Sequence, residues 1–294
     1  MNIAFVGDVH GCVRHALGAA VLLQERRGVR LDAVIQVGDL GAYPSEERYD
    51  EPSRRFGREH PAQGDFLRLL DPSPAFAGGV RLALGRLPAV LFVSGNHEDH
   101  DWLAALHAAA GADVVPVDPL GAFWHVACGS VVEIAGLRTA FLGLIEAEGY
   151  MDLDETAYGR LGSLAPGAVD LLVTHDGPYG MSRNYRGEVQ GSAKLTRLLE
   201  HLQPPLHISG HYHHPNGPRV YGRTTSYALA QLVRPRVPRG ESAPPNPQQR
   251  VNDGSLGLLD TETGAFGYLD EVWLAEVRGD DLDLAALVEG AAAR

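Results

Sequence analysis

The stretch "GDVHGC" at residues 7–12 decides the fold. It overlaps the end of "NIAFVG" (2–7), a short apolar run of the kind that forms a strand buried on both faces of a sheet. Asp8 and His10 therefore stand two positions apart at the point where this strand would end. In open α/β sheets, ligands bind beyond the C-terminal ends of the strands. The stretch raises the question of whether later strands deliver similar side chains to the same edge.

The segments that follow predict an α/β chain. A helix is expected over 14–28, where apolar residues recur near the 3.6-residue period and Gly28 marks the end, and a strand over 32–39. This β-α-β opening is typical of a parallel sheet. Strands are also expected at 88–95, 169–175, 205–213, 255–260 and 266–277, with helices at 98–111, 192–202 and the chain end, and short β segments between 112 and 145.

We expect a single domain over residues 1–294 with two β layers, because neither an internal repeat nor a linker is visible. Two segments interrupt the alternation of strands and helices. Residues 40–87 are polar, charged and contain prolines, which predicts an inserted, cap-like segment over a site, with a short helix at "DFLRLL". Residues 233–250 are rich in proline and arginine and predict a flexible surface loop.

The overall composition excludes several classes of function. A formal net charge of −12 disfavours a general nucleic-acid binder, although a small phosphorylated ligand stays compatible because the local field of a cleft matters more. Two cysteines, Cys12 and Cys128, suit a reducing compartment. The first residues show no signal-peptide pattern, and no apolar run approaches the roughly 18 residues of a membrane helix. We therefore expect a cytoplasmic protein that does not bind membranes.

Polar side chains that can bind metals follow five of the apolar stretches, each time just beyond the expected C-terminal end of a strand. They are Asp8 and His10 in "AFVGDVHG", Asp39 in "VIQVGDLG", Asn96 and His97 in "VLFVSGNHE", His175 in "LLVTHDG", and His211 and His213 in "LHISGHYHH". Taken singly, each residue would more often be structural. Their recurrence in one kind of place favours a common site.

The residue types point to metal chemistry. Carboxylate, amide and imidazole groups form a mixed oxygen and nitrogen ligand set for divalent manganese, iron, nickel or zinc. Seven such side chains exceed what one ion needs and suffice for two ions that share a bridging carboxylate, roughly 3.5–4 Å apart as in two-metal hydrolases. Neighbouring glycines, among them Gly38, Gly95 and Gly210, would allow close backbone approach where a side chain would clash with metal or substrate.

The order D-x-H, GD, GNH[DE], a strand-end histidine and GHxH resembles the calcineurin-like metallophosphoesterase superfamily. All five motifs occur in the family's order between residues 7 and 213. The resemblance implies a four-layer α-β-β-α sandwich, in which two mixed β-sheets are flanked by helices and the dimetal site lies at the sheet edge. It also implies a metal-dependent phosphoric ester hydrolase.

The resemblance further implies a role for each motif residue. One metal would be held by Asp8, His10, Asp39 and His213, and the other by Asp39, Asn96, His175 and His211, with Asp39 bridging and manganese favoured. His97 matches the family's catalytic histidine, which lies close to the metals without ligating them. Glu98 stands where the family often has aspartate. It would orient His97 by a hydrogen bond or, alternatively, serve as an acid in the first turn of the next helix.

The expected reaction is hydrolysis of a phosphomonoester or phosphodiester through a metal-bridging hydroxide, with His97 as the general acid. A small nucleotide-type substrate is favoured. Two alternatives stay open: a nuclease or phosphodiesterase on single-stranded or branched nucleic acid, which the acidic charge disfavours, and a non-catalytic metal-binding scaffold, which would not need His97. The sequence does not discriminate monoester from diester and does not predict the oligomeric state.

Candidate substrate-binding residues follow the metal motifs. Arg183 and Arg186, within "GPYGMSRNYRG" (177–187), would clamp a phosphate, with solvated loop charge as the alternative. Tyr212, between two ligand histidines, would line the pocket or pack beneath it. In the 40–87 segment, a phosphate could be bound by arginines and a base by aromatic rings; these are Arg48, Arg54, Arg55 and Arg58, and Tyr43, Tyr49 and Phe56.

Overall fold

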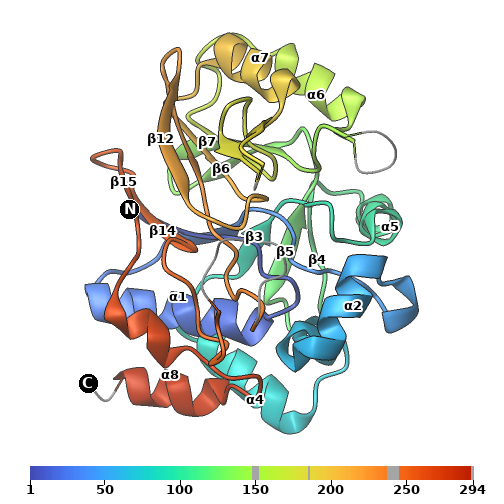
Figure 1. Cartoon of the computed structure of the whole chain (residues 1–294), viewed down its shortest axis with the longest axis vertical. Helices are drawn as coiled ribbons and strands as arrows, with labels where there is room; N and C mark the ends of the chain where they lie inside the picture. The colour runs from blue at the N-terminus through green and yellow to red at the C-terminus, as the bar shows by residue number, and fades with distance from the viewer. Residues whose placement is uncertain (148–151, 185, 237–244, 293–294) are drawn as a thin grey trace.

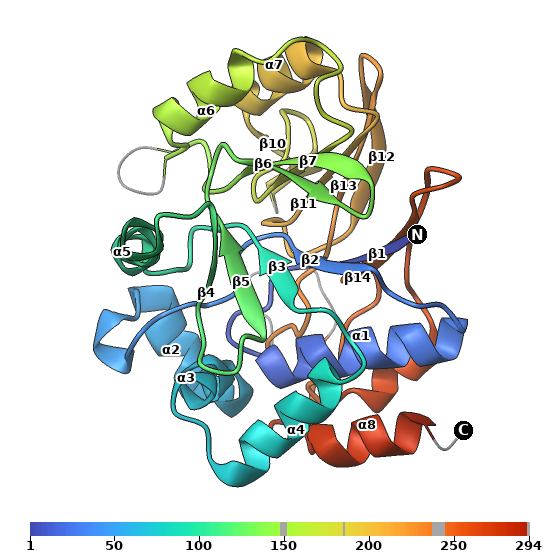
Figure 2. The same ribbon diagram turned by 180° about the vertical axis from the view of Figure 1, so that it is seen from behind.

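Two mixed β-sheets pack face to face between two layers of helices (Figures 1 and 2). The computed structural model of the chain describes residues 1–147, 152–184, 186–236 and 245–292. The predicted α-β-β-α sandwich is thereby confirmed. Parallel strands form the middle of each sheet and antiparallel strands its edges, which places the C-terminal ends of the central strands at one rim.

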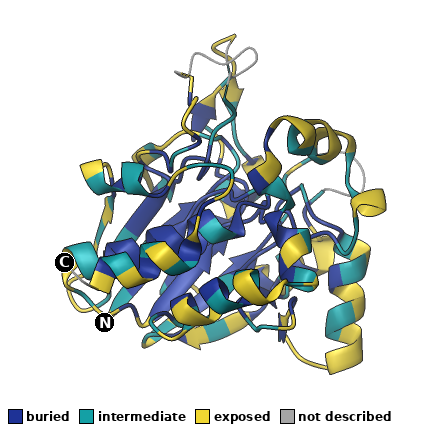
Figure 3. Ribbon diagram, turned by 90° about the horizontal axis from the view of Figure 1, so that it is seen from below, coloured by how far each residue is buried: buried dark blue, intermediate teal, exposed yellow. Residues whose placement is uncertain are grey.

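The first sheet has seven strands and contains the N-terminal strand. Its order is β15 (Ala265–Tyr268), β14 (Leu256–Asp260), β1 (Asn2–Val6), β2 (Ala33–Gln36), β3 (Val90–Phe92), β5 (Phe123–Val126) and β4 (Val114–Pro116). In the β1–β2 pair, Ile3 lies opposite Ala33 in parallel register. The outer face of this sheet is covered by α1 (Val13–Arg27), α4 (Pro74–Leu84) and α8 (Leu284–Ala292), whose inward-facing residues are buried (Figures 2 and 3).

The second sheet has six strands. Its order is β12 (Asn216–Tyr221), β13 (Thr224–Ala228), β11 (Leu206–Ser209), β8 (Leu171–Thr174), β7 (Leu137–Leu142) and β6 (Val131–Ile134). Helices α6 (Glu155–Gly162) and α7 (Ala193–Leu202) cover its outer face (Figure 1). A small hairpin of β9 (Ser182–Arg183) and β10 (Val189–Gln190) stands apart from both sheets.

Alternation of side chains along β1 explains why its apolar run is continuous. Ile3 and Phe5 point into the core between the two sheets, while Ala4 and Val6 point toward the helical layer of α1. Both faces of the strand are therefore dry, as in buried parallel sheets generally. Helix α1 ends as predicted, because Gly28 adopts the left-handed conformation (φ 60°) that closes a helix C-terminus.

The predicted strand over 266–277 is only partly correct. Strand β15 ends at Tyr268, and residues Val272–Glu276 form a short 3₁₀ helix, η3. The chain leaves the sheet there because Leu274 packs into the core on the helical side and Glu276 pairs with Arg26 of α1 at 2.9 Å. Residues Val272–Glu276 thus pack on the layer of helices instead of extending the sheet.

The predicted insertion at 40–87 is largely helical. It contains η1 (Glu46–Arg48), α2 (Glu51–Glu59), η2 (Pro61–Gly64), α3 (Asp65–Leu70) and α4, and α3 confirms the helix expected at "DFLRLL". Helix α4 belongs to the outer layer, whereas α2 buries none of its residues and lies beside α5 (His100–Ala110) at one end of the sandwich (Figure 1).

The predicted flexible loop at 233–250 falls in part on residues 237–244, which lie outside the described residues. Its described end is held in place, since Asn246 and Gln249 are buried and the side chains of both donate to the carbonyl of Arg234, at 3.3 and 3.1 Å. No helix in the described part of the chain combines the length and apolar character that a bilayer crossing requires.

Candidate active site

Loops from both sheets meet at one rim and hydrogen-bond to one another. The carbonyl of Asp39, after β2, accepts the backbone N–H of His10, after β1, at 2.8 Å. From the second sheet, the N–H of His211 donates to Asp8 at 3.1 Å, and Nδ1 of His175 donates to the carbonyl of Val37 at 3.0 Å. The motif residues from β1, β2, β8 and β11 are therefore held in one rigid frame, as the sequence predicted.

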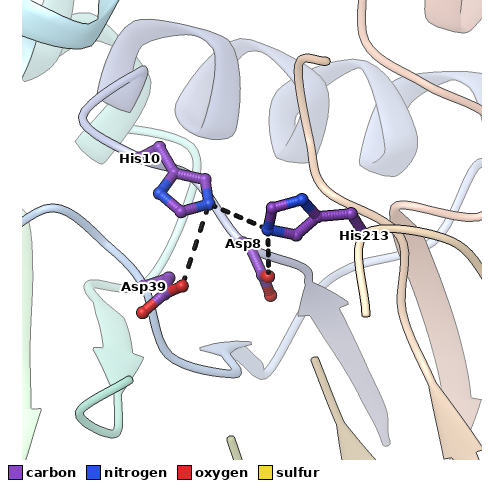
Figure 4. A group of neighbouring side chains, drawn as sticks. All are labelled: Asp8, His10, Asp39 and His213. Carbon is purple, nitrogen blue, oxygen red and sulfur yellow. Dashed lines mark hydrogen bonds and ion pairs between the residues drawn. The ribbon is translucent and has the colours of Figure 1, made fainter. Parts of the chain in front are cut away.

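Four of the predicted ligands form a tight cluster. Ligand atoms of Asp8, His10, Asp39 and His213 all lie within 4.8 Å of one another (Figure 4). Nε2 of His10 and Nε2 of His213 face each other at 3.3 Å, Nε2 of His10 lies 3.8 Å from Asp39, and Nε2 of His213 lies 3.5 Å from Asp8. This is the set that the family resemblance implies for the first metal.

The second predicted set gathers on the other side of Asp39. Nε2 of His175 lies 3.4 Å from Asp39 and 3.1 Å from the amide oxygen of Asn96. The ring of His211 stands beside that of His175, with their centroids 5.1 Å apart. Because Nδ1 of His175 is used by Val37, the ring is oriented with Nε2 toward Asp39 and Asn96, as an outer hydrogen bond commonly orients a ligand histidine.

Four of the predicted ligands occupy an unusual backbone conformation. His10, Asp39, His211 and His213 have positive φ angles of 45°, 56°, 72° and 61°. Such angles are uncommon outside glycine, and they persist only where surrounding structure enforces them, typically at functional sites. Four such residues lie together at this rim, so the backbone geometry by itself indicates a functional site there.

The glycines of the motifs make room for the ligands. A Cβ atom would collide with the ring of His175 if built on Gly38, with the carboxylate of Asp39 on Gly95, and with that of Asp8 on Gly210. The backbone at these glycines therefore approaches closely, as predicted, and the side chains it approaches are those of the predicted ligands.

The electrostatics of the rim suit a cation. Burial raises the pKa of Asp8 to about 6, because its carboxylate has no solvent to stabilise its charge. Burial opposes ionisation of Asp39 as well, but His175 and His97 outweigh it and hold its pKa well below the ordinary value. Burial lowers the pKa of His10 and of His211 to about 3, so both imidazoles are neutral and offer lone pairs. Converging lone pairs beside buried carboxylates fit divalent metal ions.

His97 lies next to this cluster and is held by a residue that the sequence analysis missed. Its Nδ1 lies 2.5 Å from Oδ2 of Asp50, and its ring centroid is 5.5 Å from that of His10. Burial lowers the pKa of His97, but Asp39 and Asp50 more than compensate and raise it to about 9. Asp50 also caps α2 by accepting the N–H of Ser53 at 2.7 Å. "YDEPS" carried the signal of a helix start, but nothing in it indicated a contact with His97.

The expectation that Glu98 orients His97 was wrong. The carboxylate of Glu98 points back to the backbone, where it accepts the N–H of Gly95 at 2.7 Å and of Gly41 at 3.4 Å. It precedes α5, whose cap is Asp99, so it is not an acid of the first turn either. Burial raises the pKa of Glu98 to about 8, and its role is to bind two loops of the rim together.

The predicted substrate-binding residues lie away from the opening beside the metal ligands. Arg183 is exposed on β9 and donates to the carbonyl of Gly187 at 2.7 Å, and Arg186 is exposed in the segment that joins β9 to β10. Tyr212 is 8% exposed and donates to Asp176 at 2.7 Å, which matches the alternative that it packs beneath the site. None of the three is among the described residues that line the pocket beside the ligands.

That pocket is lined by histidines of the rim, two of them predicted ligands, and by aromatic residues of the 40–87 segment. His10, His97 and His213 contribute one part of the lining, and Tyr43, Tyr49 and Phe56 contribute another. The three aromatic residues therefore lie where the sequence suggested that a base could stack. The arginines of the segment are not among the lining residues.

Comparison with known proteins agrees with this geometry. The family model described as calcineurin-like phosphoesterase matches residues 1–215. The Caenorhabditis elegans "UPF0046 protein K07C11.7" is 35% identical over 66 residues, which are 22% of this chain and 23% of that protein, so the match spans under a quarter of the relative.

Two solved structures cover nearly the whole chain at low identity. One crystal structure shares 14% identity at a TM-score of 0.53, over 91% of this chain and 97% of its own, and supports the fold. The structure of 5′-nucleotidase from Candida albicans shares 12% identity at a TM-score of 0.43, over 99% of this chain and 56% of its own. Taken together, the match over residues 1–215 and the motif residues gathered at the rim show that the chain belongs to the calcineurin-like phosphoesterase family.

Proposed function

We propose that the protein hydrolyses small phosphomonoesters or phosphodiesters with the help of two divalent cations, manganese being favoured. Asp8, His10, Asp39 and His213 would hold one cation, and Asp39, Asn96, His175 and His211 the other. The observation that carries the proposal is the convergence of buried carboxylates and imidazoles on either side of Asp39, next to a histidine that belongs to neither set. When bound, the cations supply Lewis-acid chemistry, polarising phosphoryl oxygens and acidifying water.

The side chains of the protein position these groups and hold the proton that the leaving oxygen receives. His97 donates Nδ1–H to Asp50, which fixes the plane of the ring and leaves Nε2 for the substrate. The raised pKa of about 9 keeps His97 protonated near neutral pH. A protonated Nε2 can donate to the leaving oxygen of the ester, which is a poor leaving group without that proton.

The two alternative functions, a nuclease and a non-catalytic scaffold, would each require a different set of residues around the site. A nuclease would need a basic path to the cations, but no arginine or lysine is among the described residues that line the pocket. A scaffold would not need a protonated histidine held in place by Asp50. Both features favour a small phosphorylated substrate. Two free cysteines, one of them fully buried, accord with a cytoplasmic location.

The proposal can be tested with protein stripped of metal and reloaded with Mn²⁺. Hydrolysis of p-nitrophenyl phosphate and bis-p-nitrophenyl phosphate is measured side by side, together with the number of bound ions. His97→Ala should keep its ions and lose turnover by roughly a hundredfold or more. His201→Ala, at the exposed C-terminal end of α7, is the matched control and should behave as wild type.

Each outcome of this assay has a definite meaning. Faster cleavage of the diester would identify a phosphodiesterase, and faster cleavage of the monoester a phosphatase. Two bound ions with no turnover of either ester would favour the scaffold. Fewer than two bound ions with no turnover would reject the proposal altogether.

A further inference from the structure

The carboxylate of Asp176 joins three segments of the chain beneath the predicted ligands, and the proposed hydrolysis gives it no role. Asp176 directly follows the predicted ligand His175 and is 5% exposed. Its carboxylate accepts the hydroxyl of Tyr212 at 2.7 Å, the N–H of Gly177 at 2.8 Å and the N–H of Glu146 at 3.1 Å. Burying a carboxylate is costly unless its oxygens are hydrogen-bonded. Three donors satisfy this one, which makes it a fixed point of the rim.

Tyr212 connects Asp176 to the neighbouring loop of the second sheet. It stands between His211 and His213, whose positive φ angles of 72° and 61° persist only where the surrounding structure enforces them. Its ring is closely packed, since a Cβ atom built on Gly177 would lie 2.9 Å from it. The bond from its hydroxyl to Asp176 therefore ties the loop after β11 to the loop after β8.

A chain of hydrogen bonds supports Asp176 from the central strands of the second sheet. The hydroxyl of Thr174 donates to the carbonyl of Asp176, so it must accept Nε2–H of His207, at 2.8 Å. Nδ1 of His207 in turn accepts the hydroxyl of Ser226 at 2.6 Å. Burial lowers the pKa of His207 to about 3, so its imidazole stays neutral and the chain keeps this direction. Strands β8, β11 and β13 thus all help to hold the main chain next to His175.

The bond between Tyr212 and Asp176 bears on the second ligand set more than on the first. His175 and His211, both in the second set, come from the two loops that this bond ties together. Of the first set, only His213 belongs to either loop, and its other members follow strands of the first sheet. Loss of the bond should therefore change the spacing within the second set and leave most of the first set in place.

We propose that Tyr212 and Asp176 are positioning residues, which set the affinity of the second cation by holding the two loops at the spacing that one ion requires. This inference rests on the proposed two-cation site and deepens it. Neither side chain is a ligand or lines the pocket, so each acts through the ligand histidine beside it. Loss of such outer hydrogen bonds typically weakens metal binding about ten- to a hundredfold.

The experiment is a calorimetric titration of metal-free protein with Mn²⁺, in wild type and in Tyr212→Phe, which removes the hydroxyl and keeps the ring. The dissociation constant of the second ion should rise about ten- to a hundredfold, while that of the first stays within about twofold. Asn96→Ala removes a ligand of the second set alone and identifies which binding step belongs to the second ion. Tyr158→Phe is the matched control and should bind both ions as wild type does, because its hydroxyl donates to the carbonyl of Lys194 between the outer helices, at 3.1 Å.

Two further measurements separate positioning from a merely structural role. Hydrolysis of bis-p-nitrophenyl phosphate by Tyr212→Phe should be slow at low Mn²⁺ and recover at saturating Mn²⁺, because only the binding of an ion is weakened. The double variant Tyr212→Phe with Asp176→Ala should bind the second ion about as weakly as Asp176→Ala alone, since both substitutions break the same bond. Additive losses, or activity that stays low at saturating Mn²⁺, would contradict the positioning role.

The outcomes distinguish this inference from the proposed function. If the second ion binds Tyr212→Phe as tightly as wild type, if both ions are weakened alike, or if Tyr158→Phe has the same effect, the inference is overturned even when the esters are hydrolysed. If Tyr212→Phe weakens only the second ion but wild type hydrolyses no ester, the positioning role is supported and the hydrolytic proposal fails. A wild type that binds a single ion would overturn both.

Discussion

The two sides of the active site are built in opposite ways. The rim that carries the metal ligands is buried, crowded and held by hydrogen bonds between loops of both sheets, with Asp8 and Asp39 at 0% and 1% exposed. The side formed by α2 has no buried residue and is tied to the rest by Asp50, Ser53 and neighbouring contacts. The contrast indicates that the groups beside the proposed metals are held rigidly, to the roughly 0.5 Å that a catalytic constellation requires, whereas α2 is free of that constraint.

The strongest test of the rigid side is Asp39→Asn. Asp39 lies between the two ligand sets, so the substitution should remove charge from both and lower kcat by at least about a thousandfold, with fewer than two ions bound per chain. Metal content and kcat are measured on the same preparation. Asp113→Asn, at an exposed position, is the control. Wild-type metal content in Asp39→Asn would show that Asp39 is not shared by the two sets.

The contact between the two sides is tested by Asp50→Asn. Asparagine still caps α2 but has no charge to hold a proton on His97, so kcat should fall roughly tenfold to a hundredfold while metal content stays unchanged. Asp50 helps to raise the pKa of His97, and the proposed mechanism needs protonated His97. Activity therefore declines as pH rises through that pKa, and in Asp50→Asn the decline should move to lower pH. An unmoved alkaline limb would mean that Asp50 only positions the ring or that His97 is not the acid.

Crowding on the rigid side is tested by Gly38→Ala. The added methyl group would collide with His175, and Gly38 has a positive φ of 98°, so the free energy of unfolding should fall by about 2–4 kcal/mol. Chemical denaturation of metal-free protein measures this without a contribution from bound ions. A change below 0.5 kcal/mol, on the scale of ordinary surface substitutions, would show that the loops of the rim can move apart.

The smallest effect is expected from the matching substitution on the other side, Gly57→Ala in α2. A methyl group on Gly57 meets nothing within 4 Å, and glycine is a poor helix former. The free energy of unfolding should rise by up to about 1 kcal/mol. If Gly57→Ala destabilised the chain as much as Gly38→Ala, the two sides would not differ in packing.

Sequence reasoning succeeded where the information is local. Strand β1, helix α1 and strand β2 follow from apolar periodicity, and the ligands follow within a few residues of strand ends, so their meeting at one rim is a consequence of parallel pairing. The family resemblance added which ligand belongs to which set, and the arrangement around Asp39 agrees with it.

The failures have a common physical cause, which is contact between residues distant in the chain. Asp50 reaches His97 across 47 positions, and Gln231 lies in the pocket because the segment after β13 runs beside the loop of Asp8. For Glu98 the error was the reverse: its position next to His97 in the sequence suggested a contact, but the two side chains point away from each other in a tight turn. Tyr212 likewise packs beneath the ligands that flank it.

The most direct test of the central claim is one titration of metal-free protein with Mn²⁺, in which bound ions and the rate of p-nitrophenyl ester hydrolysis are followed together in wild type and His97→Ala. The account predicts that both proteins bind two ions per chain, that hydrolysis in wild type requires both ions, and that His97→Ala keeps the ions and loses the rate. Full activity with a single ion, or an unchanged rate in His97→Ala, would contradict it.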